Sequence, residues 1–578
     1  MKSVKRVWKV AEEVSKESLL AYPHLHPIVC QLLQNREIDL ELADSFLSPV
    51  WENIHDSGLF RYMPEAVGRL FSALKNGETI VVHGDYDADG VCGSALLLSA
   101  FKELKNALKS ESSLNSYIPH RDKEGYGVSV ATIEKLAGSG TRLIVTVDCG
   151  ISNRPAVERA KELGMDVIIC DHHSVPVDPP IQAILIHPGV EGETYPFRHL
   201  CGTSVAYKFV SSLISEAREK GLSFPEGYEK WWLDLVAIAT VTDVMPLSGE
   251  NRLLEFFGLK VLNKTRRPGL VALVEAAGAN MGAIDTTTVG FQLGPRLNAA
   301  GRMTHASYAL DLLLSENIEE ARTRAALLND QNQARQSVCE KMYKEAAKEL
   351  QDFVSSPTMI AIVRDNWSPG LVGLVAGKLT ETHALPVVAI GKEGDRYIGS
   401  GRSIPGYDIT EALKVASAHL DRFGGHPQAC GFSAVSREEL DLALAKMKQH
   451  AEDNLPKGGV VPILEVDAEL KFETLTLDFV DRLQSLAPYG SGNPLPIFVS
   501  RMLVVRRVDC LGKQKTHLKL ALESSRGTIL PAIGFRMSDL ADSLPVGTLV
   551  DVVFEASINV WRDKKEVQLR LIDLEIRK

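Results

Sequence analysis

Three aspartates and a histidine are crowded into one short segment of the chain. His83 is followed by Asp85, Asp87 and Asp89 at alternate positions. Carboxylates this close repel one another in a folded protein, and such crowding usually persists where a cation neutralises it. The alternative is a polar turn, because aspartate and glycine are the commonest turn residues. The segment predicts a metal site if other parts of the chain bring further ligands to it.

Further candidate ligands follow three other apolar runs. They are Asp148 after 142–147, Asp171, His172 and His173 after 166–170, and Asp243 after 235–242. Taken singly, each is as often a satisfied polar residue as a ligand, and for Asp243 alone the structural interpretation is the stronger. The coincidence of all of them at the ends of apolar elements indicates a shared site.

The elements that must position these residues are predicted to form a parallel sheet. The runs at 79–82, 142–147 and 166–170 are short, rich in β-branched residues and bounded by turn formers, which is typical of buried strands. Helical patterns at 91–104 and 154–163 separate them. Such alternation predicts helices on both faces of the sheet and a ligand site at the carboxyl ends of the strands.

The types of these side chains indicate the metal. Oxygen and imidazole ligands without thiolates suit a hard or borderline divalent ion, and two imidazoles favour Mn²⁺ over Mg²⁺. Six ligands from this set are too many for one ion that must keep positions open for water and substrate: His83, Asp87, Asp89, Asp148, His172 and Asp243. We therefore expect two ions that clamp the oxygens of an in-line displacement, with a shared water as the nucleophile.

Taken in order, these motifs resemble those of the DHH phosphoesterase superfamily and, within it, of the RecJ family of single-stranded-DNA-specific exonucleases. The similarity runs through nearly the whole chain. Other segments that resemble the family are 119–127, 293–303, 399–403, 423–432 and 486–494. A lone Asp-His-His triplet would be weak support, whereas these motifs in this order are specific.

The resemblance implies a role for each candidate ligand. One ion would be bound by His83, Asp87 and Asp148, and the other by Asp89, His172 and Asp243, with one aspartate bridging them. Which aspartate bridges is left open. Asp85 would orient the ligands or the first helix, with direct ligation as the alternative. His173 would face the substrate and contact the scissile phosphate.

The resemblance also implies a set of phosphate contacts. Arg121 and Arg302 would bind phosphate in the catalytic domain, and Ser400, Arg402 and His426 would line a pocket for a terminal phosphate. Such a pocket makes a nuclease an exonuclease, and the family implies degradation from the 5′ end to mononucleotides in DNA repair and recombination. Ser368 follows Trp367 where many relatives carry a histidine, so the contact of that histidine is left open.

A chain of 578 residues is too long for a single core, and several domains are expected. The predicted fold class is α/β, with a parallel-sheet catalytic domain, a long helix, a second α/β domain and a C-terminal barrel of the OB (oligonucleotide-binding) type. Short strand-like runs separated by polar turns indicate the barrel. The expected regions are a helical extension (1–75), the DHH domain (76–303), the connecting helix (304–355), the DHH-associated domain (356–456) and the OB domain (457–578).

Composition bears on location and partners. The net charge of −10 argues mildly against a protein that coats nucleic acid, but residues 501–578 carry 14 Lys and Arg against 10 Asp and Glu. The chain shows no apolar stretch long enough for a membrane span, no signal-peptide core and no C-x-x-C pair among its eight cysteines. We expect a cytoplasmic monomer that binds single-stranded DNA. A single-strand-binding protein and a helicase are candidate partners.

Three other functions compete with this one. A superfamily phosphodiesterase for short RNA oligomers or cyclic dinucleotides would lack the barrel beyond residue 460. An inorganic pyrophosphatase would carry a different second domain, without Gly424-Gly425-His426, which we expect to form a glycine-rich turn. A non-catalytic DNA-binding scaffold would have lost metal ligands, whereas all six positions are filled here.

Overall fold

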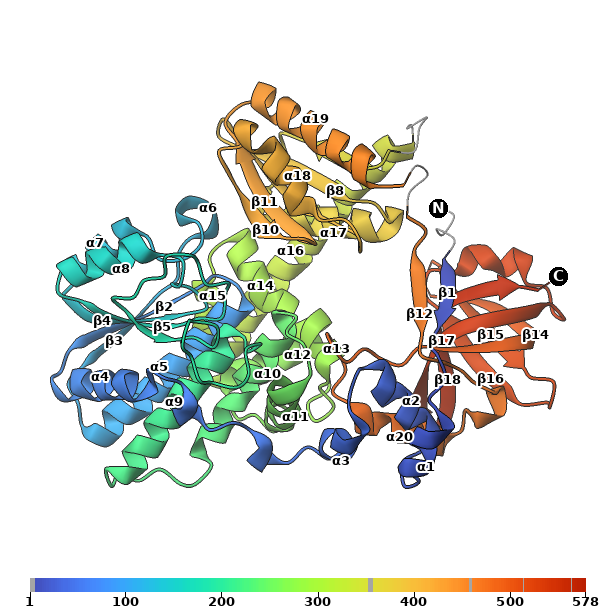
Figure 1. Ribbon diagram of the computed structural model, residues 1–578, viewed down its shortest axis with the longest axis horizontal. Helices are drawn as coiled ribbons and strands as arrows, with labels where there is room; N and C mark the ends of the chain where they lie inside the picture. Colours follow the sequence, from blue (N-terminus) through green and yellow to red (C-terminus); the bar gives the residue numbers. More distant parts are fainter. Residues whose placement is uncertain (1–5, 352–356, 457–459, 513, 563, 578) are drawn as a thin grey trace. The chain divides into compact units, whose positions relative to one another are not determined.

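The structure is a computed structural model that describes residues 6–351, 357–456, 460–512, 514–562 and 564–577. The chain forms two compact units (Figure 1), which we describe separately. The first unit comprises His55–Met245 and Phe257–Pro462, and the second comprises Arg6–Ile54, Pro246–Phe256 and Ile463–Lys578. The end of the predicted connecting segment, 352–355, and the first residues of the predicted OB domain, 457–459, lie outside the described residues.

A five-stranded parallel sheet organises the amino-terminal half of the first unit. Its spatial order is β3 (Ser113–Tyr117), β2 (Thr79–Gly84), β4 (Thr141–Val147), β5 (Asp166–Cys170) and β6 (Ile184–Ile186). The three predicted strands are confirmed as β2, β4 and β5. The other two were not predicted, because β3 is polar and half exposed and β6 has only three residues.

Helices cover both faces of this sheet, as predicted. Figure 1 shows α4 (Met63–Lys75), α5 (Ala88–Leu108) and α9 (Gly202–Glu219) on one face and α7 (Val130–Gly138) and α8 (Arg154–Glu162) on the other. Strand residues on both faces are therefore apolar. Ile144 and Val145 are neighbours that point to opposite faces of the sheet, and both are 0% exposed.

The apolar run that precedes Asp243 is a helix. It forms α10 (Leu233–Thr242), which is buried over nearly its whole length, and a short apolar run without a polar face does not distinguish a buried strand from a buried helix. The chain continues through α12 (Pro268–Ala277), α13 (Thr286–Thr288), the π-helix η5 (Val289–Leu293), α14 (Gly294–Met303) and α15 (Ser307–Leu313). The predicted long connecting helix is confirmed as α16 (Ile318–Gln351).

The second α/β domain of the first unit has a mixed sheet. Its order is β10 (Arg422–His426), β11 (Ala429–Ala434), β9 (Arg396–Arg402), β8 (Val387–Glu393) and β7 (Ile360–Val363). The helices of this domain are α17 (Pro369–His383), α18 (Ile409–Ala416) and α19 (Arg437–Asn454). The expected turn at Gly424-Gly425-His426 was wrong, because these residues belong to β10. Glycine is needed at 425 for a close approach, since a Cβ there would lie 2.4 Å from the carbonyl oxygen of Ala429.

The second unit contains the predicted barrel. Its strands are β13 (Ala468–Glu469), β14 (Phe498–Leu511), β15 (His517–Glu523), β16 (Ile529–Gly534), β17 (Leu549–Trp561) and β18 (Lys564–Ile576). Pairing of β14 with both β15 and β17 closes the sheet. The amino-terminal segment, predicted as helices only, also contributes β1 (Val7–Val10), which pairs with β12 (Ile463–Val466). Ile28 and Leu32 of α2 (Pro27–Asn35) belong to the same core as Phe498 of the barrel.

One buried arginine joins three distant segments of the second unit. The guanidinium of Arg252, in α11 (Gly249–Leu262), donates hydrogen bonds to the carbonyl oxygens of Phe46 (3.0 Å), Leu486 (2.8 Å) and Ala487 (2.8 Å). It also stacks on the ring of Phe46, with 3.7 Å from Cζ to the ring centroid. Arg252 is 2% exposed, and burial lowers its pKa to about 10, so it is still charged at neutral pH.

We expect Arg252→Leu to destabilise the second unit by about 3 kcal/mol or more, because several buried carbonyl groups would lose their donor. For a unit of this size such a loss lowers the unfolding midpoint by roughly 6–12 °C in calorimetry of the full chain. Arg526→Leu, at an exposed arginine of the same unit, is the control and should shift the midpoint little. Equal midpoints for the two variants would contradict the role of Arg252.

Candidate metal centre and phosphate cavity

The predicted metal ligands meet at the carboxyl edge of the parallel sheet. Gly84, Val147 and Cys170 are paired in register, so the residues that follow them, Asp85, Asp148 and Asp171, lie in one row along that edge. Asp87 caps α5, and Asp89 lies in the first turn of this helix. Asp243 is the C-terminal cap of α10. The side chains of separate elements are thus delivered to one place.

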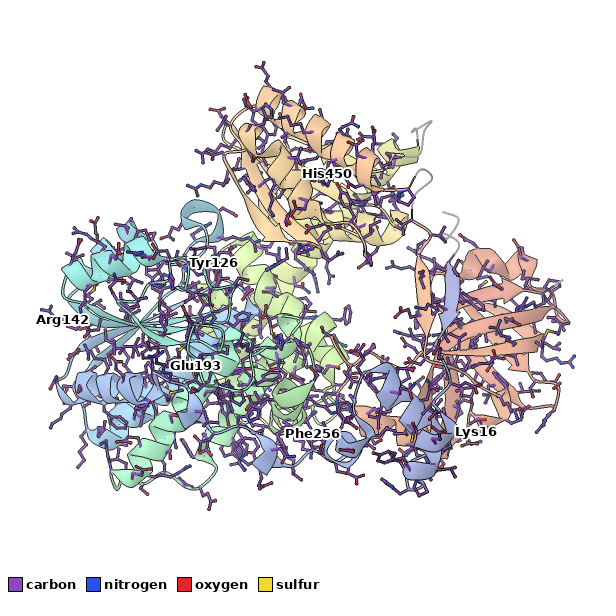
Figure 2. All side chains as sticks on the ribbon, viewed as in Figure 1. Lys16, Tyr126, Arg142, Glu193, Phe256 and His450 are labelled. Carbon is purple, nitrogen blue, oxygen red and sulfur yellow. The ribbon has the colours of Figure 1, made fainter. Side chains whose placement is uncertain are left out.

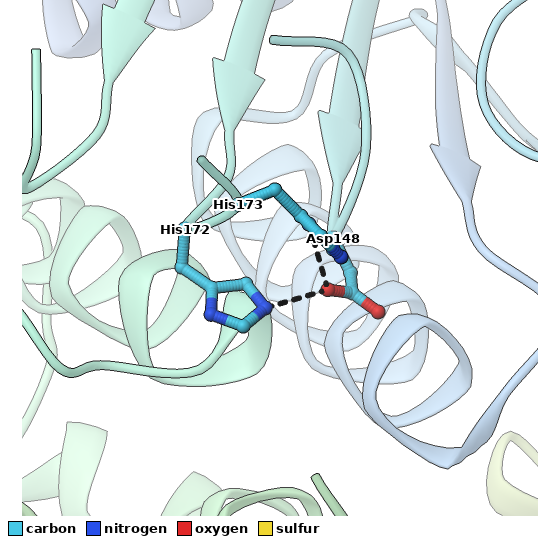
Figure 3. A group of neighbouring side chains, drawn as sticks. All are labelled: Asp148, His172 and His173. Carbon is cyan, nitrogen blue, oxygen red and sulfur yellow. Dashed lines mark hydrogen bonds and ion pairs between the residues drawn. The ribbon is translucent and has the colours of Figure 1, made fainter. Parts of the chain in front are cut away.

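One group of candidate ligands surrounds His172. Its Nε2 lies 3.2 Å from Oδ1 of Asp148, 3.5 Å from Oδ2 of Asp243 and 3.9 Å from Oδ2 of Asp89. Figure 3 shows the carboxylate of Asp148 facing the imidazole of His172. Burial lowers the pKa of His172, so a neutral ring presents a nitrogen to three carboxylates. This geometry suits the shared coordination of a cation.

A second group consists of aspartates alone. Ligand atoms of Asp85, Asp87 and Asp148 lie within 4.8 Å of one another, and Asp148 also contacts His172 and His173. Asp148 therefore occurs in both groups and stands where a bridging ligand is required. Asp85, for which an orienting role was preferred, lies here among the possible direct ligands.

His83 stands apart from both groups. The residue is 0% exposed, and its Nδ1 lies 3.6 Å from the sulfur of Cys149. Its Nε2 is buried and has no hydrogen-bond partner among the described residues. Burial lowers the pKa of His83 to about 4, so the ring is neutral at physiological pH. An unpartnered buried imidazole nitrogen beside a carboxylate cluster fits a metal ligand.

Electrostatics explain why the cluster needs a cation. Burial raises the pKa of Asp148 well above its usual value, and the charges of Asp89 and Asp87 raise it further. Burial and the same two neighbours raise the pKa of Asp243 to about 9. The carboxylates therefore cannot all ionise together at neutral pH unless positive charge is supplied. Divalent cations that prefer oxygen and imidazole ligands would supply it.

Backbone amides hold one of the carboxylates in place. Oδ2 of Asp89 accepts a hydrogen bond of 2.7 Å from the amide of Gly202, and Oδ1 accepts one of 2.8 Å from the amide of Thr203. Both amides belong to the first turn of α9, where the helix dipole favours a negative charge. Gly202 is required here, because a Cβ would lie 2.6 Å from the Cβ of Asp148.

Asp171, the first residue of the triplet, orients His173; the sequence named it as a candidate ligand but assigned it no role. The residue is 0% exposed, and its Oδ1 lies 2.8 Å from Nδ1 of His173. Burial raises the pKa of Asp171, but hydrogen bonds from His173 and the backbone outweigh it and lower the pKa to about 2. Burial lowers the pKa of His173, but Asp171 and other carboxylates raise it to about 9. His173 is therefore cationic at neutral pH.

A tyrosine that the sequence did not single out supports His173. The hydroxyl of Tyr126 donates to the carbonyl oxygen of Asp148 at 3.0 Å, and its oxygen lies 3.1 Å from Nδ1 of His173. Figure 2 labels Tyr126 in the first unit. The residue lies between Gly125 and Gly127, whose φ angles are 80° and 83°. The motif itself was noted, but nothing in a single sequence indicates which side chain the ring would contact.

Four of the five predicted phosphate-binding residues line one cavity of about 300 Å³. They are Arg121, Arg302, Ser400 and Arg402, and Tyr86 also lines the cavity. Burial, together with the charges of Arg121 and other arginines, lowers the pKa of Arg302 to about 10. Guanidinium groups gathered in this way suit an anion such as a phosphate.

The fifth predicted residue lies elsewhere on the same sheet. His426 is exposed and is not among the residues that line the cavity. Ala429 of β11 pairs with both His426 and Arg402, so two strand spacings separate these two residues. Ser368 is the N-terminal cap of α17, and the next residues, Pro369 and Gly370, line the cavity.

The fold and the site together define a phosphoesterase of the DHH class. Three family models match the chain: the DHH family N-terminal domain at residues 79–240, the DHHA1 domain at 355–453 and the RecJ OB domain at 466–573. None of the described helices is both long and apolar enough to cross a bilayer.

Curated relatives identify the family more closely. The chain is 34% identical to the single-stranded-DNA-specific exonuclease RecJ of Bacillus subtilis, over 99% of this chain and 71% of the relative. It is 32% identical to the Escherichia coli protein of the same name, over 94% of this chain and 95% of the relative. The chain belongs to the RecJ family of single-stranded-DNA-specific exonucleases.

Solved structures agree with this assignment. RecJ of Thermus thermophilus in complex with Mn²⁺ is 27% identical and has a TM-score of 0.82, covering 99% of this chain and 80% of that chain. The same protein in complex with Mg²⁺ is 26% identical and has a TM-score of 0.77, covering 99% and 79%. The predicted fold class, with its two α/β domains and OB-type barrel, is confirmed.

We expect Tyr126→Phe to lower the turnover number on single-stranded DNA on the order of 10-fold, because His173 loses a hydrogen-bonding neighbour that fixes its ring. The Michaelis constant should change little, since the phenyl ring still fills the same space. Tyr308→Phe, at a half-exposed tyrosine of α15, is the matched control. Steady-state kinetics measures both constants, and an unchanged turnover number would contradict the role of Tyr126.

Proposed function

We propose that this chain is a metal-dependent exonuclease that degrades single-stranded DNA from the 5′ end and releases mononucleotides. One observation carries the proposal: Tyr86 lines the guanidinium-lined cavity, and its sequence neighbours Asp85 and Asp87 belong to the crowded carboxylate and imidazole cluster. The relatives named above are single-stranded-DNA-specific exonucleases. We infer a role in DNA repair and recombination from the family.

Two divalent cations, Mn²⁺ or Mg²⁺, would be held by the cluster. Asp89, His172 and Asp243 would bind one ion, and Asp85, Asp87 and His83 would serve the other, with Asp148 shared. When bound, the ions would supply an activated water and stabilise the charge of the attacking and leaving oxygens. The chain's own contribution is to fix the side chains of the site, as α9 does for the ligand Asp89 and Asp171 does for the ring of His173.

His173 would act on the substrate rather than on a metal. Its ring is cationic at neutral pH and is half exposed, with 39% of the side chain accessible. A cation held in this place would stabilise the negative charge that develops on the phosphate oxygens in the transition state. Asp171 and Tyr126 position the ring, and neither needs to touch the substrate.

The neighbouring cavity explains why the cut would fall next to a chain end. Tyr86 lines the cavity, and it lies in the sequence between Asp85 and Asp87 of the metal cluster. A terminal phosphate held by Arg121, Arg302 and Arg402 would therefore place the following phosphodiester beside the metals. A single nucleotide would be released in each cycle. His426, which lies outside the cavity, would contact the same DNA strand.

The remaining parts of the chain would serve longer substrates. An OB-type barrel is a known platform for single strands, and an enzyme for very short RNA oligomers or cyclic dinucleotides would lack it. We further propose that the protein acts as a monomer in the cytoplasm. A single-strand-binding protein and a helicase would supply it with single strands.

We expect Asp89→Asn to lower Mn²⁺-dependent degradation of single-stranded DNA by about 100-fold or more, because a ligand charge fixed by two backbone amides is removed. The assay uses single- and double-stranded DNA labelled at either end, with a 5′ phosphate or a 5′ hydroxyl, and follows product lengths in time. Asp330→Asn, at an exposed aspartate of α16, is the control. Binding of single-stranded DNA should persist in both variants.

The same assay tests polarity. A 5′ label should appear at once as a mononucleotide, a 3′ label should shorten stepwise, and a 5′ hydroxyl should slow the reaction. Full activity of Asp89→Asn would contradict the metal assignment, and early internal cuts would contradict exonuclease action.

A further inference from the structure

An exposed aromatic residue lies on an unusual helical turn next to the metal cluster. Phe291 is 79% exposed and belongs to η5, a π-helical segment of five residues. Segments of π-helix are rare and are frequent at functional sites, because the wider turn changes where side chains point. The element is well anchored, since Asp285 caps the preceding α13 through the amide of Thr288 at 2.7 Å.

Close contacts place this turn against the end of α10. A Cβ at Gly294 would lie 2.3 Å from Cγ2 of Thr242, and a Cβ at Gly290 would lie 3.5 Å from Cγ1 of Val241. The next residue after Thr242 is the candidate ligand Asp243. Gly290, the residue before Phe291, therefore packs against the last turn of α10, which is followed by Asp243.

A second apolar residue is exposed at the same rim. Val244 follows Asp243, is 69% exposed and has a φ of 57°. A β-branched residue in this region of φ is strained, and strain of this kind is concentrated at functional sites. Glycine or asparagine would adopt this φ with less strain. The backbone conformation therefore does not explain why a valine is found at this position. Single exposed apolar residues need no explanation, but two beside a buried ionic site are unusual.

The charged groups of the site suit phosphates rather than bases. The carboxylates, His173 and the guanidinium groups all suit phosphates or the metals that hold them. A nucleotide whose phosphate lies at the metals still has an apolar base to place, and an aromatic face is the usual platform for an unstacked base. Phe291 provides such an exposed face on the element that packs against the last turn of α10, directly before Asp243.

We propose that Phe291, supported by Val244, is a stacking platform for one nucleobase of the single-stranded substrate, close to the scissile phosphate. The proposal rests on the function proposed above and adds a base subsite to it. Because every base has an apolar face, the subsite accepts any sequence. A base in a duplex is covered by its neighbours, so the platform also contributes to the preference for single strands.

The test compares intact oligonucleotides with oligonucleotides that lack one base. Full-length wild-type protein and Phe291→Ala are assayed with Mn²⁺ on 5′-phosphorylated single strands that carry one abasic nucleotide at successive positions from the 5′ end. For the wild type, kcat/KM should fall on the order of 10-fold at one position. For Phe291→Ala, kcat/KM on the intact strand should fall by a similar factor, and the abasic nucleotide should cause no further loss.

Two variants complete the design. Phe291→Tyr keeps the aromatic face and should keep both the activity and the sensitivity to the missing base. Trp231→Ala is the control, because this 49% exposed aromatic residue lies at the other end of α10, about 15 Å away along the helix. It should behave as the wild type on every substrate.

The possible results separate this inference from the proposed function. If the wild type degrades single strands but Phe291→Ala responds to the abasic nucleotide as the wild type does, the platform is wrong while the exonuclease assignment stands. If the wild type does not degrade single-stranded DNA at all, the proposed function fails first. A third result is that Phe291→Ala loses activity while the ratio of its kcat/KM on intact and abasic strands equals that of the wild type. That result would indicate a structural role for Phe291 and would also overturn the proposal.

Discussion

Repulsion among buried carboxylates is the constraint on which the rest of this structure depends. Asp85, Asp87 and Asp148 bring oxygens within 4.8 Å of one another at the edge of a sheet. Burial and mutual repulsion raise the pKa values of these groups, so the site is unfavourable as a set of bare anions. Strand register and helix caps nevertheless hold these carboxylates together. Bound cations would neutralise their charge and so explain why the fold tolerates the cluster.

The surroundings of the cluster follow from the same constraint. The amides of α9 hold the carboxylate of Asp89, and His173 presents a positive ring on the exposed side. The nearby cavity has the opposite problem, because burial and neighbouring guanidinium groups lower the pKa of Arg302. A terminal phosphate in the cavity would neutralise the arginines, and bound cations would neutralise the carboxylates.

Much of the site could be predicted because its residues are marked by local patterns. Asp148 and Asp171 directly follow β-branched runs. The register between the paired strands then places the two residues side by side at the edge of the sheet. Tyr126 and the amides of Gly202 and Thr203 were missed because they act through contacts between segments far apart in the sequence. No spacing rule within one sequence reports such contacts.

What the prediction of the fold missed has similar causes. The run before Asp243 was predicted only as an apolar element, because its period does not distinguish helix from strand, and the structure shows α10. Gly424 and Gly425 indicated a turn, but both belong to β10, and glycine is needed at 425 for the close approach of β10 and β11. Strand β1 was missed because its partner, β12, is more than 450 residues away. The barrel, whose strands alternate locally, was predicted correctly.

Counting the bound metal tests the central claim most directly. Calorimetric titration of the metal-free full chain with Mn²⁺ at neutral pH should give two ions per chain, with release of protons from the crowded carboxyl groups. Asp148→Asn should weaken both sites together, because Asp148 belongs to both groups of ligands. Binding of no ion, or two sites that are unaffected by this substitution, would contradict the account.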